Sequence, residues 1–288
     1  YLASRYLPAD RPQTSGVRSG FDVLGTVLLA LTLAAYALAM TLGRGHFTVL
    51  NLALLLTAAM GLGLFVLAQA RVASPLIHLA QLRNRVLSAS LAMSTLVATV
   101  IMTTLVVGPF YLSHGLGLNP TVTGLVLAIG PCVAALTGMP AGRIADRFGA
   151  RRMTVVGLLA MAVGCLVLAL LPQTLGAAGY VVPIVVLTLG YAVFQTANNT
   201  TVMGDVATEQ RGVIAGLLNL SRNLGLITGA SVMGAVFAVA TQAADVASAS
   251  PQAIGHGMRV TFGVAFGLTL LALTLSCGSG LARDGRQR

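Results

Sequence analysis

The chain has 288 residues, of which 56% are hydrophobic and only 8% are charged. Soluble domains carry roughly 25% charged residues, so this composition excludes a water-soluble globular protein and a disordered one, and it indicates an integral membrane protein. The net charge is +10, and all 17 basic residues are arginines. In a soluble chain this charge would suggest a nucleic-acid partner. Here the arginines gather between apolar runs, so we interpret the charge as membrane orientation and expect no nucleic-acid partner.

Residues 1–21 form a polar opening segment that contains arginine and proline and precedes the first apolar run. The segment begins with Tyr1 and lacks the pattern of a signal peptide. We therefore expect the chain to be a piece of a longer protein whose earlier part is missing, and we interpret residues 1–21 as a cytoplasmic segment because of the distribution of arginines given below.

Eight apolar runs follow, each about as long as the roughly 20 residues that a membrane-spanning helix needs. Glycine and proline inside these runs do not argue against helices, because membrane helices tolerate both. The sequence therefore predicts an all-α integral membrane protein with about eight transmembrane helices. Their predicted ranges are 22–42, 47–70, 86–112, 121–141, 153–172, 180–204, 212–240 and 259–281.

The positions of the arginines support both the number of spans and their orientation. If residues 1–21 are cytoplasmic, fourteen of the 17 arginines lie on the cytoplasmic side, Arg44 and Arg259 lie outside, and Arg222 lies within a span. This bias is typical of membrane proteins, whose cytoplasmic loops collect basic residues. The sequence therefore predicts a multi-pass protein of the cell membrane with both termini in the cytoplasm and a cytoplasmic loop at 71–85.

Two of the later spans carry polar residues on one helical face, because these residues are spaced i, i+3 and i+4. Polar faces within a membrane point into the bundle or toward water, so these residues are candidates for lining a cavity or, alternatively, for hydrogen bonds between helices. Arg222 is the only charge deep in a span, and the amides of span 180–204 are its expected partners. The candidate cavity residues are Gln195, Asn198, Asn199, Asn219, Arg222 and Asn223.

The span 212–240 also contains two pairs of glycines that lie four residues apart. This spacing lets two helices approach closely, so we predict that the glycines serve helix packing. The pairs are Gly212 with Gly216 and Gly225 with Gly229.

The sharpest local motif is GxxxDRxGxRR, which lies in a predicted short inner loop between spans 121–141 and 153–172. Glycine permits a tight turn there, and Asp146 can accept hydrogen bonds from the start of the next helix and pair with nearby arginines. Such a cluster can hold one conformation and release it in another. We therefore predict a conformational latch, with a positively charged loop and helix cap as the alternative. The motif residues are Gly142, Arg143, Asp146, Arg147, Gly149, Arg151 and Arg152.

This motif resembles the signature inner loop of the major facilitator superfamily. Other stretches resemble the fourteen-helix drug/proton antiporter branch of that family; they are residues 8–12, 75–85, 110–120 and 209–225. The resemblance covers nearly the whole chain and implies two linker helices followed by a six-helix C-terminal transporter lobe. The ranges that it implies are 22–70 for the linker helices, 86–281 for the lobe and 282–288 for a cytoplasmic tail.

The resemblance also implies a function. It suggests a secondary active transporter that exports drugs or other small lipophilic or cationic compounds by alternating access. The implied partners are a small-molecule substrate, the lipid bilayer and a missing N-terminal six-helix lobe, and the implied coupling ion is a proton, with no cofactor. Proton coupling needs an ionisable group in the transport path. Since no aspartate or glutamate lies well inside a span, we expect that carboxylate in the missing lobe.

Other functional classes fit the sequence less well. An enzyme within the membrane needs a nucleophile with a base, paired aspartates or a metal cluster, and the predicted spans contain no histidine, aspartate or glutamate well inside them. The three cysteines have no metal-ligand spacing, and the ATP-binding motif GxxxxGK[ST] needs a lysine, which the chain lacks. We therefore expect neither catalytic residues nor a metal site. A non-transporting membrane receptor or assembly subunit is the alternative that stays open.

Overall fold

A computed structural model describes residues 22–42, 48–72, 81, 83–204, 206–207, 210–242 and 249–284 of the chain. Eight helices in these residues are long and apolar enough to cross a membrane, which confirms the predicted all-α membrane fold. They are α2 (Val23–Thr41), α3 (Val49–Arg71), α5 (Arg85–Phe110), α6 (Pro120–Phe148), α7 (Ala150–Leu170), α8 (Gly176–Met203), α9 (Arg211–Thr241) and α10 (Pro251–Asp284). Two short elements complete the described chain, the π-helical turn η1 (Tyr111–Gly115) and the 3-10 turn η2 (Gln173–Leu175).

Several helices are longer than the apolar runs that predicted them. Helix α6 continues from the predicted end of its span through Phe148, and α10 begins at Pro251, eight residues before the predicted start. Arg259 therefore lies inside α10 rather than in a connecting loop, and its predicted position on the outer side of the membrane stays a prediction. The predicted cytoplasmic segment 1–21 and most of the predicted loop 71–85 lie outside the described residues.

Short polar residues begin several of the helices. The carboxylate of Asp22 accepts from the backbone N–H of Gly25 (2.8 Å) at the start of α2, and Asn84 caps α5 in the same way through Val86 (2.9 Å). Asn119 caps α6 through the N–H of Val122 (2.9 Å), directly before a proline at the first helical position. Such caps satisfy N–H groups that have no partner within the helix, so they set where each span starts.

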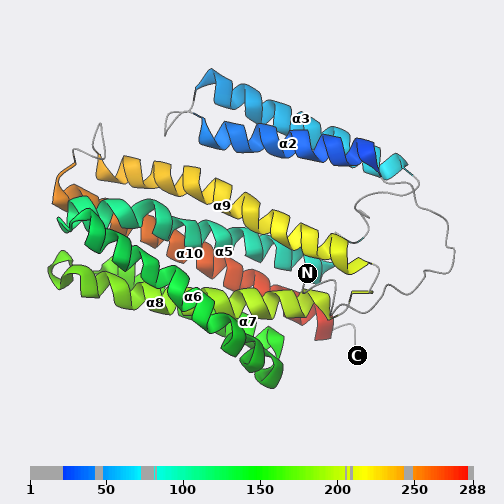
Figure 1. Cartoon of the computed structure of the whole chain (residues 1–288). Helices are drawn as coiled ribbons and strands as arrows, with labels where there is room; N and C mark the ends of the chain where they lie inside the picture. The colour runs from blue at the N-terminus through cyan, green and yellow to red at the C-terminus, as the bar shows by residue number, and fades with distance from the viewer. Residues whose placement is uncertain are drawn as a thin grey trace, which may run out of the picture.

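Helices α5 to α10 form one lobe around a shared apolar core (Figure 1). Helix α7 packs along α8, α5 packs along α9, and α10 contacts both α7 and α5. The core between these helices is made of large aliphatic and aromatic side chains with almost no exposure. Helix α6 lies against α8 at one side of the lobe, and only three of its residues are buried: Thr123, Ala141 and Ala145.

The hairpin of α2 and α3 lies outside this lobe, beside α9 (Figure 1). Inside the hairpin, the side-chain amide of Gln69 donates to the carboxylate of Asp22. Toward the lobe, the hydroxyl of Tyr36 bonds that of Thr228, and the hydroxyl of Ser231 donates to the carbonyl of Met40. Two hydrogen bonds thus link the hairpin to one side of α9, one between two hydroxyls and one from a hydroxyl to a backbone carbonyl.

Candidate functional site

The open side of α9 carries three polar residues in an otherwise apolar lobe. Asn219 and Asn223 are exposed, and Arg222 is half-buried. Arg222 lies eleven residues beyond Arg211, or about 16 Å along the helix, which places it near the middle of a span. A charge at that depth costs about 2.5–3.5 kcal/mol to insert, so this face needs water or a protein partner against it.

The guanidinium of Arg222 is only partly satisfied. Its Nη2 donates to the side-chain oxygen of Asn219 at 2.9 Å, one turn away on the same helix. Its Nε is buried and has no partner among the described residues. The expected pairing of Arg222 with the amides of α8 is therefore absent from the described part of the chain, since α8 and α9 make few contacts. Asn219 holds one side of the guanidinium and leaves Nε without a hydrogen bond.

The three amides of α8 have different surroundings. Asn198 is 1% exposed and lies between α8 and α5, where it donates to the hydroxyl of Ser94 (3.0 Å) and to the carbonyl of Ser90 (3.4 Å). This geometry favours the interhelical alternative for Asn198 over a cavity role. Gln195 and Asn199 are half-buried and keep some open surface, and the side-chain oxygen of Asn199 has no described partner.

The described spans contain no carboxylate at depth. Among the side chains that the structure describes, the carboxylates are Asp22 and Asp146, and both lie at helix ends. The same residues contain no cluster of histidine, cysteine, aspartate and glutamate that could hold a metal ion. Arg222 is therefore the only formal charge near the midplane of the lobe as described.

The GxxxDRxGxRR motif is not the loop that its composition predicts. Helix α6 runs through Phe148, Gly149 makes the turn, and α7 begins at the next residue. Gly149 has a φ of 88°, a left-handed conformation that glycine adopts without strain. The turn occupies one residue because the polar half of the motif continues α6 beyond the apolar run.

Asp146 does not cap α7, contrary to the sequence-based expectation. Gly149 holds the cap position, and no side chain caps the helix. The carboxylate of Asp146 is exposed and bonds to none of the residues that the structure describes. Arg147 places its guanidinium 5.6 Å from the ring centroid of Phe148, and Gly142 has open space where a side chain would project. Whether this motif acts as a latch stays a prediction.

The two glycine pairs of α9 differ sharply. A methyl group on Gly229 would lie 2.9 Å from the Thr99 backbone, and one on Gly225 would overlap the carbonyl of Thr95. These two glycines therefore let α9 approach α5, and the hydroxyl of Thr99 donates to the carbonyl of Gly225 (3.0 Å) across the contact. A methyl group on Gly212 or Gly216 would meet no atom within 4 Å, so among the described residues no helix packs against this pair, and its predicted packing role stays a prediction.

Sequence reasoning missed the most extensive helix contact of the lobe, which joins α7 and α8. A methyl group on Gly157 would lie 2.7 Å from the carbonyl of Gly190, and one on Gly164 would lie 2.8 Å from the Leu187 side chain. The seven-residue spacing of Gly157 and Gly164 places both on one face of α7. That spacing was the available signal in an otherwise almost purely apolar run.

Comparison with known proteins gives concordant matches. A family model of the Major Facilitator Superfamily matches residues 1–230. An uncharacterized transporter of Escherichia coli, YebQ, is 30% identical over 234 residues, which are 81% of this chain and 50% of YebQ. The multidrug efflux pump LfrA of Mycolicibacterium smegmatis is 33% identical over 122 residues, which are 42% of this chain and 24% of LfrA. The chain thus spans half, or less, of the length of these curated relatives.

A solved structure supports the fold in the same way. The crystal structure of the nucleoside transporter NupG superposes with a TM-score of 0.58 over 88% of this chain and 65% of that chain. The sequence identity is 16%, so this likeness bears on the arrangement of helices alone.

Proposed function

This chain belongs to the major facilitator superfamily, and we propose that it forms one half of a secondary transporter that exports small drug-like compounds. The observation that carries the proposal is the open polar side of α9, with Asn219, Arg222 and Asn223 near the middle of an apolar lobe. Polar groups at this depth face a water-filled cavity or another protein surface. Gln195 and Asn199 of α8 supply further polar surface in the same half of the lobe.

We propose that a second six-helix lobe covers this side and that the substrate path runs between the two. Uncovered, the amides and the guanidinium would face lipid, at several kcal/mol for each unsatisfied group. In carriers built from two repeats, the binding site lies at their interface, and access alternates as one repeat rocks against the other. Half of YebQ lies outside the region that matches this chain, which leaves room for such a lobe.

The proposed substrates are lipophilic or cationic compounds, and the proposed coupling ion is a proton. The resemblance to LfrA, which is named a multidrug efflux pump, supports this class over the membrane receptor or assembly subunit that the sequence left open. Proton coupling needs a group that titrates within the path. No described carboxylate lies there, so the proposal assigns coupling to a carboxylate of the second lobe.

Two linked measurements test the proposal. The first compares ethidium efflux, with and without a protonophore, in cells that express the complete reading frame and in cells that express none of it. The second reconstitutes the 288-residue chain alone in liposomes with an imposed proton gradient. We expect protonophore-sensitive efflux in the first and no gradient-dependent ethidium uptake in the second. Failure of the first would refute the transporter, and uptake in the second would refute the two-lobe assignment.

We propose further that the α6–α7 turn faces the cytoplasm, as the distribution of arginines indicates. Cysteines introduced by Asn119→Cys and Ala150→Cys, in a background without Cys132 and Cys277, would report the two ends of α6. In intact cells a membrane-impermeant maleimide should label the cysteine at position 119 and spare the one at 150. The opposite pattern would invert the proposed topology.

A further inference from the structure

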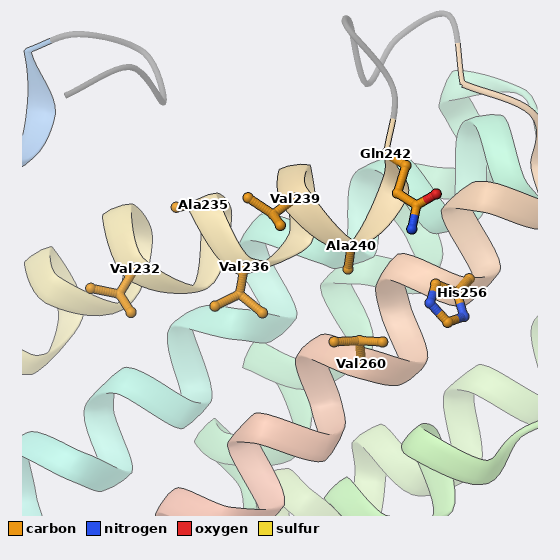
Figure 2. A pocket seen from close by; sticks show the side chains of 8 residues that line it. All are labelled: Val232, Ala235, Val236, Val239, Ala240, Gln242, His256 and Val260. Carbon is orange, nitrogen blue, oxygen red and sulfur yellow. The ribbon is translucent and has the colours of Figure 1, made fainter.

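A groove of about 590 Å³ lies between the last turns of α9 and the first turns of α10. Its walls are small aliphatic side chains, and two polar side chains, Gln242 and His256, lie at the end formed by the last residue of the α9 segment and the second turn of α10 (Figure 2). Val239 is 77% exposed and Val232 is 42% exposed, so the groove opens sideways rather than into the core. In a helix pair that crosses a bilayer, such an opening faces the acyl chains.

The groove is separate from the polar side of α9. Val232 and Ala235 lie one turn beyond Thr228 and Ser231, the residues that contact α2, so the groove continues the side of α9 on which the hairpin is attached. Thr228 lies nine residues, or about two and a half turns, after Asn219, so these two side chains point to opposite sides of the helix. A ligand in the groove would not enter the proposed substrate path.

Arg259 supplies a second, independent observation at this place. It is exposed, lies one turn beyond His256 on α10, and has neither an ion pair nor a hydrogen bond among the described residues. Helix α10 has 34 residues, or about 51 Å, against a hydrocarbon core of about 30 Å. Arg259 lies eight residues, or about 12 Å, after the first residue of α10. This distance places it near the boundary between headgroups and acyl chains.

We propose that this end of α9 and α10 is a binding site for an anionic phospholipid. One acyl chain lies in the groove along Val232, Val236 and Val260. The headgroup phosphate lies at the boundary, where Arg259 provides the charge and His256 and Gln242 provide hydrogen-bond donors. A guanidinium can donate two parallel hydrogen bonds to a phosphate, which satisfies an arginine that the described protein leaves without a partner.

The absence of tryptophan from the chain makes a direct experiment possible. A single tryptophan introduced by Val239→Trp reports on the groove, and one introduced by Val163→Trp reports on an apolar, lipid-facing site of α7. The purified protein is placed in vesicles that contain either brominated phosphatidylglycerol or brominated phosphatidylcholine, and fluorescence quenching is measured. At each tryptophan, quenching by brominated phosphatidylglycerol is divided by quenching by brominated phosphatidylcholine. This ratio is then compared between the two positions, so that differences in the depth of the two tryptophans in the bilayer cancel.

We expect phosphatidylglycerol to be preferred about fivefold at position 239, because one basic residue near an anionic headgroup contributes about 1 kcal/mol. No preference is expected at position 163. Arg259→Gln should abolish the preference at 239, and Arg259→Lys should keep most of it, provided that both variants elute as the parent does. An equal ratio at the two positions, or a preference that survives Arg259→Gln, would overturn the site.

Discussion

Helix α9 has one side that packs against α5 and another that is open and polar. On one side, Gly225 and Gly229 bring its backbone against α5, and the hydroxyls of Thr95 and Thr99 donate to α9 carbonyls across the contact at 3.1 and 3.0 Å. On the other side, about a third of a turn away, Asn219 and its neighbours are open. The first side is closed by this lobe itself, whereas the second is not.

The difference shows what drives association when water is absent. Lipid chains are as apolar as leucine, so helices gain from close backbone approach and from hydrogen bonds between them rather than from burying apolar surface. The α5 side of α9 has both close backbone approach and hydrogen bonds between helices. The open side has polar groups without such partners, which is the property expected of a surface that meets a second lobe and a solvated path. Four predictions test this contrast.

The largest effect is expected where the packed side is disturbed. Replacing Gly225 and Gly229 by alanine should destabilise the lobe by about 1–3 kcal/mol per site, because each added methyl meets the backbone of α5. A thiol-reactive dye can follow thermal unfolding through Cys165, which is fully buried. The exposed Cys132 and Cys277 are first changed to serine, so that the dye reports only unfolding.

The matched control uses the other glycine pair of the same helix. Gly212 and Gly216 have open space around them, and alanine is favoured over glycine in a helix by up to about 1 kcal/mol. The Gly212→Ala/Gly216→Ala variant should therefore melt at or above the parent temperature. If both pairs shift the melting temperature equally, the packed side of α9 has been assigned wrongly.

The second prediction concerns the open side. Arg222→Ala in the complete protein should lower ethidium efflux roughly tenfold or more while leaving membrane insertion nearly unchanged, since a hydrogen bond to a charged group is worth about 1.5–3 kcal/mol. Efflux is measured per molecule, after quantifying the protein in the membrane. Arg222→Lys keeps the charge without the planar guanidinium, so its efflux should lie between that of the parent and that of Arg222→Ala.

Arg211→Ala is the control for Arg222. This residue is also an arginine of α9, but it is exposed at the first position of the helix and only its Nε approaches a carbonyl, that of Val206, at 3.4 Å. Efflux should stay close to the parent level in this variant. Parallel losses of protein and efflux on changing Arg222 would identify it as a structural arginine instead.

The fold followed from the sequence because each span leaves a composition signal of its own. Eight apolar runs gave eight helices, and the strong caps Asn84 and Asn119 lie within two residues of two predicted starts. The ends of α6 and α10 were missed for a common reason. Both helices extend past the apolar run into polar sequence. Hydropathy marks only the apolar part of a helix that lies within the membrane, so it does not locate the ends of the helix.

The site was less predictable, since helical periodicity shows which residues share a face but not what that face meets. Asn198 and Asn199 are adjacent in the sequence, yet Asn198 is buried against α5 while Asn199 keeps open surface. The glycine spacing was equally ambiguous, because Gly212 and Gly225 each begin a four-residue pair and only the second has a helix against it. In both cases the position of α5 determines which residues are buried. A local sequence pattern does not show where another helix of the chain lies.

The third prediction extends the contrast to the cytoplasm-facing end proposed for α6. Asp146 is exposed and has no described partner, so Asp146→Asn should leave the melting temperature unchanged. If the motif is a latch, efflux by the complete protein should still fall, by about two- to fivefold, as for the loss of an exposed ion pair that forms in one conformation only. Asp146→Glu keeps the charge and should retain efflux. If the Asp146→Asn variant keeps full efflux, the motif forms the α6–α7 turn and does not act as a latch.

The smallest effect is expected at the attachment of the α2–α3 hairpin, where the hydroxyl pair of Tyr36 and Thr228 links α2 to α9. Hydrogen bonds between membrane helices average about 0.6 kcal/mol, so Tyr36→Phe and Thr228→Val should each lower the melting temperature only slightly. Thr228 also bonds the carbonyl of Leu224 in its own helix (2.7 Å), which gives its hydroxyl a second partner when Tyr36 is changed.

A double-mutant cycle separates the pair from its surroundings, because the two single variants also remove contacts of their own. The coupling energy from the four melting curves should be close to the average for one such bond, and far below the effect of the glycine variants. The ordering follows from geometry: a methyl forced against backbone cannot relax, whereas a hydroxyl that loses one partner can turn to another. A coupling as large as the glycine effect would mean that the hairpin is part of the packed lobe, and that the side of α9 bearing Thr228 belongs with Gly225 and Gly229.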